Sequence, residues 1–379
     1  MPQNPPKINP DQEETPKKAG KPRILVAPLD WGLGHATRCV PLIRELLAQG
    51  ADVWLAGEGA QTAILTEAFP LLPVLELPGY RIRYARTKWG LPGMIALQVP
   101  RLLRVIKSEH EWLKRKIEAH QFDAVISDNR YGLYHKTVPC IFITHQLTIK
   151  TGFGKGTERW LQKLNYRYIN RFRACWVPDH ASAPNLAGTL SHPFIKPGIP
   201  VQYTGPLSRF EKKEQPEIKN HLLLLLSGPE PQRTLLEEKI IEQVAHYPGT
   251  ATVVRGLPAG AGLIPSTNQI RFFNHLPADA LTEEMLRAEW VISRSGYSTL
   301  MELAGLRKKS ILIPTPGQTE QEYLARYHRG MKTAFSAAQN NFSLAEILQE
   351  ARGFSYHPFP VSTSHTLRLI LQQFLDTLQ

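Results

Sequence analysis

Cysteine is scarce in this 379-residue chain, and its hydrophobic runs are short. Cys39, Cys140 and Cys175 lie far apart and beside apolar residues, which favours buried thiols in a reducing compartment over disulfides or a metal site. The longest leucine run, Leu222 to Leu226, is far too short to cross a bilayer. No signal peptide is recognisable, and residues 1–22, rich in Pro, Lys and Glu, are expected to form a disordered tail. These absences favour a soluble, cytoplasmic protein, with attachment to the inner face of the cell membrane left open.

The charge balance of the chain is strongly basic. Its formal net charge is +12, while hydrophobic residues make up 42% of the sequence, enough for large cores. Such a charge favours anionic partners such as nucleotides, phosphates or anionic lipid surfaces. No block of Lys and Arg with interleaved aromatic residues resembles a nucleic-acid module, so nucleic acid is not expected as a partner.

Strand and helix patterns alternate almost throughout, which predicts an α/β fold with parallel sheets and helices on both faces. Strands are expected at 23–29, 52–56, 72–77, 124–127, 140–144, 175–177, 202–204, 221–226, 250–254, 269–273, 290–292 and 309–313. Helices are expected at 36–49, 62–69, 91–120, 158–173, 235–246, 278–287, 320–328, 344–351 and 366–378, with another following the turn at Gly296.

A polar stretch at 207–220 separates two α/β halves of similar size that share no sequence repeat. The expected parts are the tail 1–22, a first Rossmann-like domain 23–206, a linker 207–220, a second Rossmann-like domain 221–352, and a connector with a final helix 353–379. Ligands of open parallel sheets bind beyond the carboxyl ends of the strands. Two such domains facing each other would place both sets of loops on one cleft.

The stretch from Val291 to Glu302 predicts a strand, a turn at Arg294-Ser295-Gly296 and a helix. Backbone N–H groups at the start of such a helix, with the positive end of its dipole, favour an anion such as a diphosphate. Glu302 lies about one turn past Ser298 on the same helix face, where it could accept two hydroxyls of a ribose. The alternative is an ordinary turn capped by Ser295, with Glu302 a solvated charge.

Two residues of the first half are candidates for proton transfer. His35 follows Gly32-Leu33-Gly34 and opens a helix, which would favour its neutral, base-competent form. Asp128 follows a predicted strand and could orient His35 or take a proton itself. The alternatives are that His35 only caps the helix and that Asp128 only forms an Asx-type turn after the strand. The turn matches the dinucleotide motif G-x-G-x-x-G only weakly, which leaves a dehydrogenase as a distant alternative, and His145 ranks lower as an acceptor contact.

Further strand-end turns of the second half are polar or glycine-rich. Ser227-Gly228 would let phosphate approach the backbone, and Arg255-Gly256 ends the next strand. The loop from Pro314 to Glu322 carries Gln and Glu side chains that suit the hydroxyls of a sugar. On its own this loop is also explained as a Pro-Gly turn before a capped helix.

Taken together these residues resemble the family-28 glycosyltransferases, from about Arg23 onward. The Arg-Ser-Gly turn, the later Glu302, the Pro-rich loop with Gln residues, Gly32-x-Gly34-His35 and the Thr-Gly…Arg segment at 204–209 carry the likeness. The resemblance is closest to an uncharacterised branch with W-G-x-G-H in its first turn. It implies the two-domain glycosyltransferase-B fold, with the final helix returning to the first domain.

By resemblance, the second domain binds a nucleoside-diphosphate sugar, commonly UDP-linked, and transfer needs no metal or cofactor. Ser295, Gly296 and Tyr297 would contact the diphosphate, Glu302 the ribose and Gln318 to Gln321 the sugar. The catalytic candidates are His35 and Asp128. The full set of donor-binding candidates is Gly34, Arg209, Ser227, Gly228, Arg255, Arg294, Ser295, Gly296, Tyr297, Ser298, Glu302, Gln318, Glu320 and Gln321. Glu322 and Pro206 depart from the Gln and Asn common in the family, which leaves the sugar open.

A base without a covalent nucleophile predicts inversion at the anomeric carbon, with an acceptor that the sequence does not identify. From Tyr80 to Lys116, basic residues alternate with Tyr, Trp, Leu and Ile, which suits anionic lipid headgroups and a lipid-linked acceptor. The alternative is an amphipathic core helix with a solvated basic face. Alternative functions are a nucleotide-sugar hydrolase or epimerase, and a non-catalytic nucleotide-sugar binder.

Overall fold

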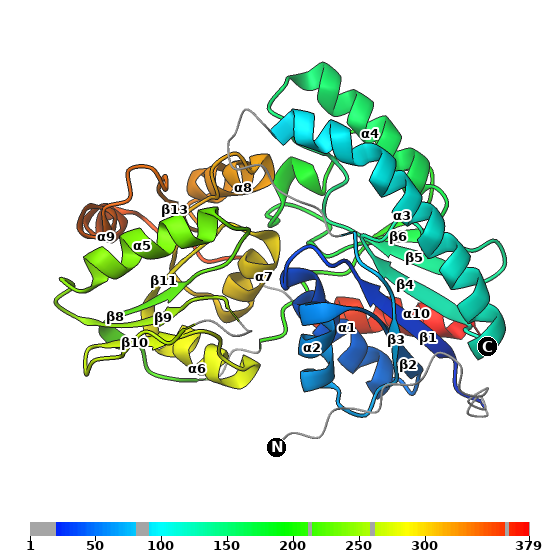
Figure 1. The fold of residues 1–379 in the computed structure, drawn as a ribbon, viewed down its shortest axis with the longest axis horizontal. Coiled ribbons are helices and arrows are strands. Elements are labelled where there is room, and N and C mark those ends of the chain that lie inside the picture. Colours follow the sequence, from blue (N-terminus) through cyan, green and yellow to red (C-terminus); the bar gives the residue numbers. More distant parts are fainter. Residues whose placement is uncertain (1–19, 81–90, 211–213, 258–261, 361–363, 379) are drawn as a thin grey trace. The chain divides into compact units, whose positions relative to one another are not determined.

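The computed structural model describes residues 20–80, 91–210, 214–257, 262–360 and 364–378 (Figure 1). It divides into two compact units. The first unit comprises Met1–Arg83, Gly93–Arg209 and Ser362–Gln379, and the second comprises Phe210–Val361 with the short segment Tyr84–Pro92. The expected tail at 1–22 falls mostly outside the described residues.

The first unit is built on a seven-stranded parallel sheet of order β3-β2-β1-β4-β5-β6-β7. Its strands are β1 Arg23–Pro28, β2 Asp52–Gly57, β3 Val74–Glu76, β4 Ala124–Asp128, β5 Cys140–Ile143, β6 Ala174–Val177 and β7 Val201–Tyr203. Its helices are α1 Gly34–Ala48, α2 Gly59–Ala68, α3 Leu91–His120, α4 Lys155–Ile169, the short 3-10 helix η2 Gly188–Leu190, and α10 Ser364–Asp376.

The second unit is built on a six-stranded parallel sheet of order β10-β9-β8-β11-β12-β13. Its strands are β8 Ile218–Leu225, β9 Thr250–Val254, β10 Ile270–Phe273, β11 Ala288–Ser293, β12 Ser310–Leu312 and β13 Phe335–Ser336. Its helices are α5 Gln232–Val244, α6 Ala278–Arg287, α7 Tyr297–Leu306, α8 Thr319–Gly330 and α9 Leu344–Gly353. Two parallel α/β domains were the expected fold class, and this prediction is confirmed.

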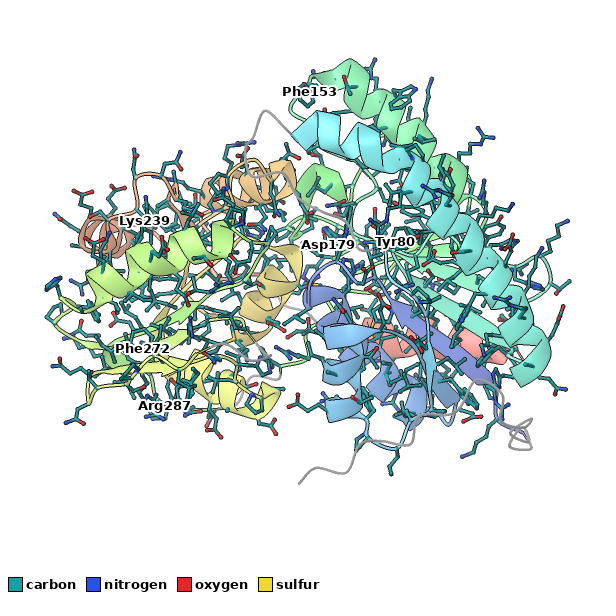
Figure 2. All side chains as sticks on the ribbon, viewed as in Figure 1. Tyr80, Phe153, Asp179, Lys239, Phe272 and Arg287 are labelled. Atoms are coloured by element: carbon teal, nitrogen blue, oxygen red, sulfur yellow. The ribbon has the colours of Figure 1, made fainter. Side chains whose placement is uncertain are left out.

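Each sheet lies in its own apolar core, because strands covered on both faces by helices read as nearly continuous apolar runs. In the first unit the fully buried core includes Val125 and Phe142. In the second it includes Leu222, Leu224 and Ile292. Of the residues labelled in Figure 2, Tyr80 and Asp179 belong to the first unit, and Lys239 and Phe272 to the second. All three cysteines are free and buried, as expected.

The strand order of each sheet reverses at one point, between β1 and β4 in the first unit and between β8 and β11 in the second. At such a switch point the connecting helices leave toward opposite faces of the sheet, so the loops beyond the two strands diverge and open a crevice. The loop beyond β1 leads to His35 at the start of α1, and β4 ends at Asp128. The loops beyond β8 and β11 carry Ser227 and Ser295. Both groups of candidate residues therefore lie where an open parallel sheet takes a ligand.

The structure differs from the expected domain bounds at the junctions. Strand β8 begins at Ile218, inside the stretch 207–220 expected to be a linker, because Ile218 pairs with Ala288 of β11 even though residues 218–220 are exposed. The second unit extends to Val361 rather than to 352. Helix α10 packs on α1, where Gln49 donates a side-chain hydrogen bond to the carbonyl of Arg368. Within the described part of the chain, no helix is both long and apolar enough to span a membrane.

Candidate functional site

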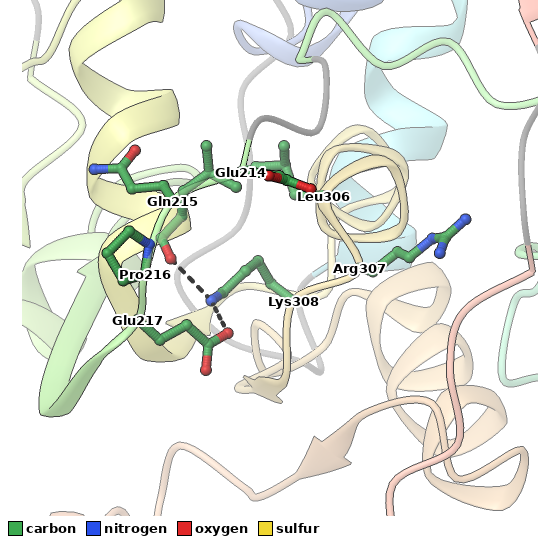
Figure 3. Close-up of a pocket in the computed structure, with 8 residues that line it drawn as sticks. Glu214, Gln215, Pro216, Glu217, Leu306, Arg307 and Lys308 are labelled. Atoms are coloured by element: carbon green, nitrogen blue, oxygen red, sulfur yellow. Dashed lines mark hydrogen bonds and ion pairs between the residues drawn. The ribbon is translucent and has the colours of Figure 1, made fainter.

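One pocket of the second unit lies away from the candidate residues (Figure 3). It is lined by residues that precede strands, including Glu217 before β8 and Lys308 before β12. The buried ammonium of Lys308 donates to the carboxylate of Glu217 and to the carbonyl of Leu286 at 3.2 Å. Because it lies at the amino ends of the strands, this pocket is not the ligand crevice that the topology predicts.

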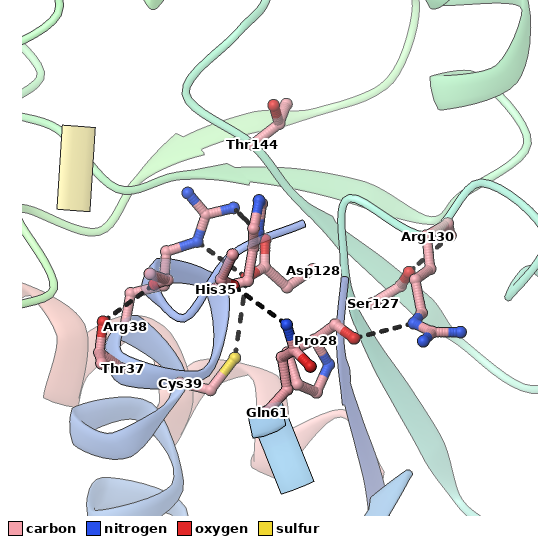
Figure 4. Close-up of polar contacts among 12 residues, drawn as sticks. Pro28, His35, Thr37, Arg38, Cys39, Gln61, Ser127, Asp128, Arg130 and Thr144 are labelled. Carbon is pink, nitrogen blue, oxygen red and sulfur yellow. Dashed lines mark hydrogen bonds and ion pairs between the residues drawn. The ribbon is translucent and has the colours of Figure 1, made fainter. Parts of the chain in front are cut away.

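The first candidate site joins the loop after β1 to the end of β4 (Figure 4). Pro28 at the end of β1 is in register with Asp128 at the end of β4, so the loop after β1 starts beside that carboxylate. Helix α1 begins at Gly34, one residue before His35, and its first turn carries the imidazole to Asp128. The His35 Nδ1 atom lies 3.1 Å from Asp128 Oδ2. Sequence reasoning proposed this pair, and the structure places the two side chains in contact.

Arg38, which sequence reasoning missed, binds both members of the pair. It donates from Nε to Asp128 Oδ2 at 2.8 Å and from Nη2 to Asp128 Oδ1, while Nη2 also lies 2.8 Å from His35 Nδ1. Its Nη1 atom lies 3.3 Å from Nδ1 of His145, a residue that follows β5. The signal in the sequence is the spacing, because positions three apart on a helix share a face and Arg38 stands among apolar residues of α1.

Burial and these charges set the protonation of the cluster. Burial lowers the pKa of His35, the positive charge of Arg38 lowers it further, and Asp128 acts in the opposite direction. Burial alone would raise the pKa of Asp128, but Arg38 and His35 outweigh it and bring the pKa down to about 2. At neutral pH the site therefore holds an ionised carboxylate and a neutral imidazole. A neutral imidazole whose Nδ1–H donates to Asp128 leaves Nε2 able to accept a proton.

A buried network fixes the loop that carries this site. Arg130, which follows β4, donates from Nε to the carbonyl of Pro28 at 2.8 Å and from Nη1 to the carboxylate of Glu109 on α3 at 2.8 Å. The hydroxyl of Tyr80 donates to the same carboxylate at 2.7 Å. Burial raises the pKa of Glu109, while Arg130 and Tyr80 act to lower it. The network ties the ends of β1 and β4 to α3, so it holds in place the backbone from which the loop before His35 departs.

The second candidate site lies at the start of α7, beyond β11. The N-cap residue is Gly296, not Ser295, because the Ser295 hydroxyl donates to the carbonyl of Gln321 at 2.8 Å instead. Tyr297 and Glu302 are buried, with Glu302 only 6% exposed, so the alternative of a solvated Glu302 is wrong. Ser298 lies four residues before Glu302 and is half-buried on the same face.

Arg294 lies fully inside the second unit, next to this helix start. It donates from Nη2 to the carbonyl of Gln232 at 2.7 Å and from Nη1 to those of Ile313 and Pro314 at 3.2 and 3.4 Å. Burial lowers its pKa to about 10, so the guanidinium remains charged at neutral pH. Within the described residues its Nε atom has no hydrogen-bond partner and no carboxylate forms an ion pair with it. Among these residues, the buried guanidinium is therefore held by backbone carbonyls.

The loop before α8 closes on itself. The Gln321 side chain accepts the backbone N–H of Thr315 at 3.0 Å and donates to the side chain of Gln318. Glu322 accepts the backbone N–H of Gly317 at 2.9 Å. Gln318 and Glu320 are half-buried, whereas Gln321 is buried. The loop is thus shaped by its own polar side chains.

The remaining donor-binding candidates have different surroundings. Ser227 and Gly228 are exposed after β8, and Gly228 has a φ of 105°. Arg255, by contrast, is engaged within the unit: its Nε lies 2.6 Å from Glu237 Oε1 and its Nη1 lies 2.7 Å from Asn274 Oδ1. Gly34 and Arg209 belong to the first unit, and Gly34 accepts the Thr37 hydroxyl at 3.0 Å. Ser227 and Gly228 thus share the β8–β11 switch point with Ser295, whereas the guanidinium of Arg255 is held by α5.

Comparisons with known proteins relate the chain to glycosyltransferases. Residues 233–368 match the model of the glycosyltransferase family 28 C-terminal domain. An uncharacterized glycosyltransferase of Methanosarcina acetivorans is 24% identical over 327 residues, which cover 79% of each chain. A UDP-N-acetylglucosamine--N-acetylmuramyl-(pentapeptide) pyrophosphoryl-undecaprenol N-acetylglucosamine transferase of Haemophilus ducreyi is 21% identical over 327 residues, 83% of this chain and 85% of that protein.

Solved structures of glycosyltransferases share the fold. The glycosyltransferase SnogD of Streptomyces nogalater superposes with a TM-score of 0.61 at 15% identity, covering 95% of this chain and all of that one. MurG of Acinetobacter baumannii superposes with a TM-score of 0.52 at 13% identity, covering 95% and 99%. Residues 233–368 thus match the family 28 C-terminal domain, and the chain is similar to family 28 glycosyltransferases and has the glycosyltransferase-B fold.

Proposed function

We propose that this glycosyltransferase transfers a hexosyl group from a UDP-linked sugar to an acceptor hydroxyl, with inversion at the anomeric carbon and His35 as the general base. The observation that carries the proposal is the contact of His35 with Asp128 and Arg38 at the switch point of the first sheet. His35 is neutral at pH 7 and lies against an ionised carboxylate that would stabilise its protonated form, which is the combination that a general base needs.

In the proposed step, the acceptor O–H proton moves to Nε2 of His35 while the acceptor oxygen forms a bond to the anomeric carbon. The bond from that carbon to the diphosphate breaks, and the leaving diphosphate takes the electron pair. The carboxylate of Asp128 stabilises the imidazolium that forms, since it lies 3.1 Å from Nδ1. A positioned base of this kind contributes about 10²–10⁴-fold to the rate.

The second unit supplies the donor site of the proposal. The start of α7 at Gly296 and the charge of Arg294 would stabilise the diphosphate, and Glu302 would accept the ribose hydroxyls. Ser227 and Gly228 follow β8 on the other side of the β8–β11 switch point and would complete the diphosphate site. The Gln318–Gln321 loop would contact the sugar. Gly34, Arg209, Arg255, Tyr297, Ser298 and Glu320 remain donor-site candidates from the sequence alone.

We propose a lipid-linked acceptor on the cytoplasmic face of a membrane. The Haemophilus ducreyi relative is named for an undecaprenol-linked acceptor. The stretch from Tyr80 to Lys116 supports the same acceptor class through its basic and apolar composition. Much of that stretch lies outside the described side chains, but Val99 and Leu103 of α3 are 42% and 47% exposed beside exposed Arg101 and Arg104.

Donor binding tests the second unit separately from catalysis. In calorimetric titrations with UDP, Glu302→Ala should weaken binding by about tenfold or more, because a buried, charge-assisted hydrogen bond contributes roughly 1.5–3 kcal/mol. Glu350→Ala, an exposed carboxylate on α9, is the matched control and should leave affinity unchanged. Equal affinity in both variants would remove Glu302 from the donor site.

Transfer is tested by incubating a panel of nucleotide sugars with and without lipid and sugar acceptors, with products read by mass spectrometry. His35→Ala should lower the rate of transfer by about 10²–10⁴-fold while UDP binding persists. Retained stereochemistry at the anomeric carbon would overturn the inverting mechanism, and rapid acceptor-free hydrolysis would favour a nucleotide-sugar hydrolase. Full activity of His35→Ala would exclude this base.

A further inference from the structure

Three neighbouring strands of the second sheet, β8, β11 and β12, end side by side. Their last residues are in register with one another, and these are Leu225, Ser293 and Leu312. Gly228, Gly296 and Thr315 each stand three residues beyond one of these strand ends. The three turns therefore leave the same edge of the sheet, with Gly296, at the start of α7, on the middle strand.

The hydroxyl of Thr315 is buried without a hydrogen-bond partner. The residue is 1% exposed, and no atom of the described residues forms a hydrogen bond with its Oγ1. Its backbone, by contrast, is engaged, because its N–H donates to Gln321 Oε1 at 3.0 Å and its carbonyl accepts the N–H of Gln318 at 3.1 Å. A buried hydroxyl without a partner destabilises a fold, so a group of this kind indicates a water or a ligand that satisfies it.

Gly228 leaves room for a ligand beside this hydroxyl. Gly228 is exposed, and a Cβ atom added to it would lie 3.6 Å from Thr315 Oγ1. The hydroxyl therefore faces the turn after β8, although Thr315 follows β12 and the two strands are separated by β11. Because glycine has no side chain, a ligand that lies over this turn can bring an oxygen within hydrogen-bond distance of Oγ1.

The surroundings of the hydroxyl favour an anion. Arg294 fixes the backbone just before Thr315, because its Nη1 donates to the carbonyls of Ile313 and Pro314 at 3.2 and 3.4 Å. Its guanidinium carries a second buried atom, Nε, without a partner in the part of the chain that the structure describes. The start of α7 at Gly296 adds the positive end of a helix dipole. A buried cation, a helix start and a buried hydroxyl thus meet at one edge of the sheet.

We propose that Thr315 binds the β-phosphate of the donor nucleotide, by donating a hydrogen bond from Oγ1 to a phosphate oxygen. This inference rests on the proposed function, and Thr315 was not among the donor-site candidates from the sequence. The β-phosphate is the one that carries the sugar, and Thr315 opens the loop whose Gln318 and Gln321 would contact that sugar. Since the Thr315 N–H is bonded to Gln321, the hydroxyl and the sugar-side loop are fixed to one another. When the sugar leaves, negative charge develops on the β-phosphate, and a positioned donor stabilises it.

Calorimetric titrations of the full-length protein with UDP and with UMP test this assignment. Thr315→Val removes the hydroxyl but keeps the shape of the side chain, so it should raise the Kd for UDP about tenfold or more, the effect of losing a hydrogen bond to a charged group. The Kd for UMP, which lacks the β-phosphate, should not change. Thr315→Ser keeps a hydroxyl and should bind UDP nearly as tightly as the wild type. Thermal unfolding without nucleotide should give Thr315→Val a Tm no lower than that of the wild type, because the hydroxyl bonds to none of the described residues.

Ser310 offers a matched control at the other end of β12. It is fully buried, and its hydroxyl also lacks a partner among the residues that the structure describes. Ser310→Ala should leave the Kd for both nucleotides unchanged. A wild-type protein that binds no UDP would overturn the proposed function and this inference with it, whereas equal UDP affinity in the wild type and Thr315→Val would overturn this inference alone. An equal loss for UDP and UMP, a lower Tm of Thr315→Val, or a loss of affinity shared by Ser310→Ala would also overturn it.

Discussion

One ring nitrogen of His35, Nδ1, lies next to a hydrogen-bond acceptor and a hydrogen-bond donor. Nδ1 lies 3.1 Å from a carboxylate oxygen of Asp128, which accepts a hydrogen bond. It also lies 2.8 Å from Nη2 of Arg38, which can only donate a hydrogen bond. The carboxylate favours the tautomer with hydrogen on Nδ1, and the guanidinium favours the one with hydrogen on Nε2. The balance between Asp128 and Arg38 therefore decides whether Nε2 can act as a base.

Replacing Arg38 and replacing Asp128 should shift the pKa of His35 in opposite directions. Arg38→Gln removes a charge that lowers this pKa, so the pKa should rise, whereas Asp128→Asn removes a charge and a hydrogen bond that raise it, so the pKa should fall. NMR titration of the His35 ring protons measures both shifts without any substrate. Histidines of the second unit in the same spectra are the reference, and shifts of the same sign in the two variants would contradict this account.

The proposed role of Arg294 is a second effect at the scale of one residue, in which a buried charge would act on the diphosphate without touching it. Arg294→Met should weaken UDP binding by roughly tenfold, the size of one charge interaction across several ångströms at an effective dielectric near 20, while uridine binding stays unchanged. Comparative titration with both ligands measures this difference. Arg307→Met, an exposed arginine at the other end of α7, is the control. Equal losses for both ligands would indicate a structural defect instead.

At the scale of elements, the turns beyond β8 and β9 are packed closely enough to exclude a side chain. Gly256 has a φ of 71°, and a Cβ atom there would lie 2.4 Å from the carbonyl oxygen of Leu226. Gly256→Ala should therefore destabilise the second unit by about 1–3 kcal/mol through backbone strain alone. Urea unfolding measures the loss, and Gly262→Ala, with no heavy atom within 4 Å of the added carbon, should be nearly neutral. A neutral Gly256→Ala would mean that the turn can shift.

Most helices and strands could be predicted from the sequence because their apolar residues are regularly spaced. Strand β9 and helix α6 have the predicted bounds, and the strand-end turns carry the predicted candidate residues. Strand β13, two residues long, carries no readable period and was missed. Contacts between distant residues were missed for a different reason. The Glu109–Arg130 ion pair depends on how α3 lies across the sheet, which local patterns do not encode.

At the scale of the whole molecule, α10 completes the first unit after the chain has passed through the second. Leu371 on its inner side is fully buried, whereas Leu369 is 42% exposed. Leu371→Ala should lower the stability of the first unit by about 2–5 kcal/mol, and Leu369→Ala should have little effect. Denaturant unfolding monitored in each unit measures this. A loss confined to the second unit would contradict the assignment of α10 to the first.

The return of α10 to α1 also sets an order of events during synthesis. Residues 210–361 leave the ribosome before α10 does, so the second sheet can assemble while the first still lacks a helix that covers α1. Until then, the part of α1 against which α10 packs stays uncovered. A nascent chain should thus present a finished second unit while its first unit is still unfinished, so the first unit is the one expected to need chaperone protection.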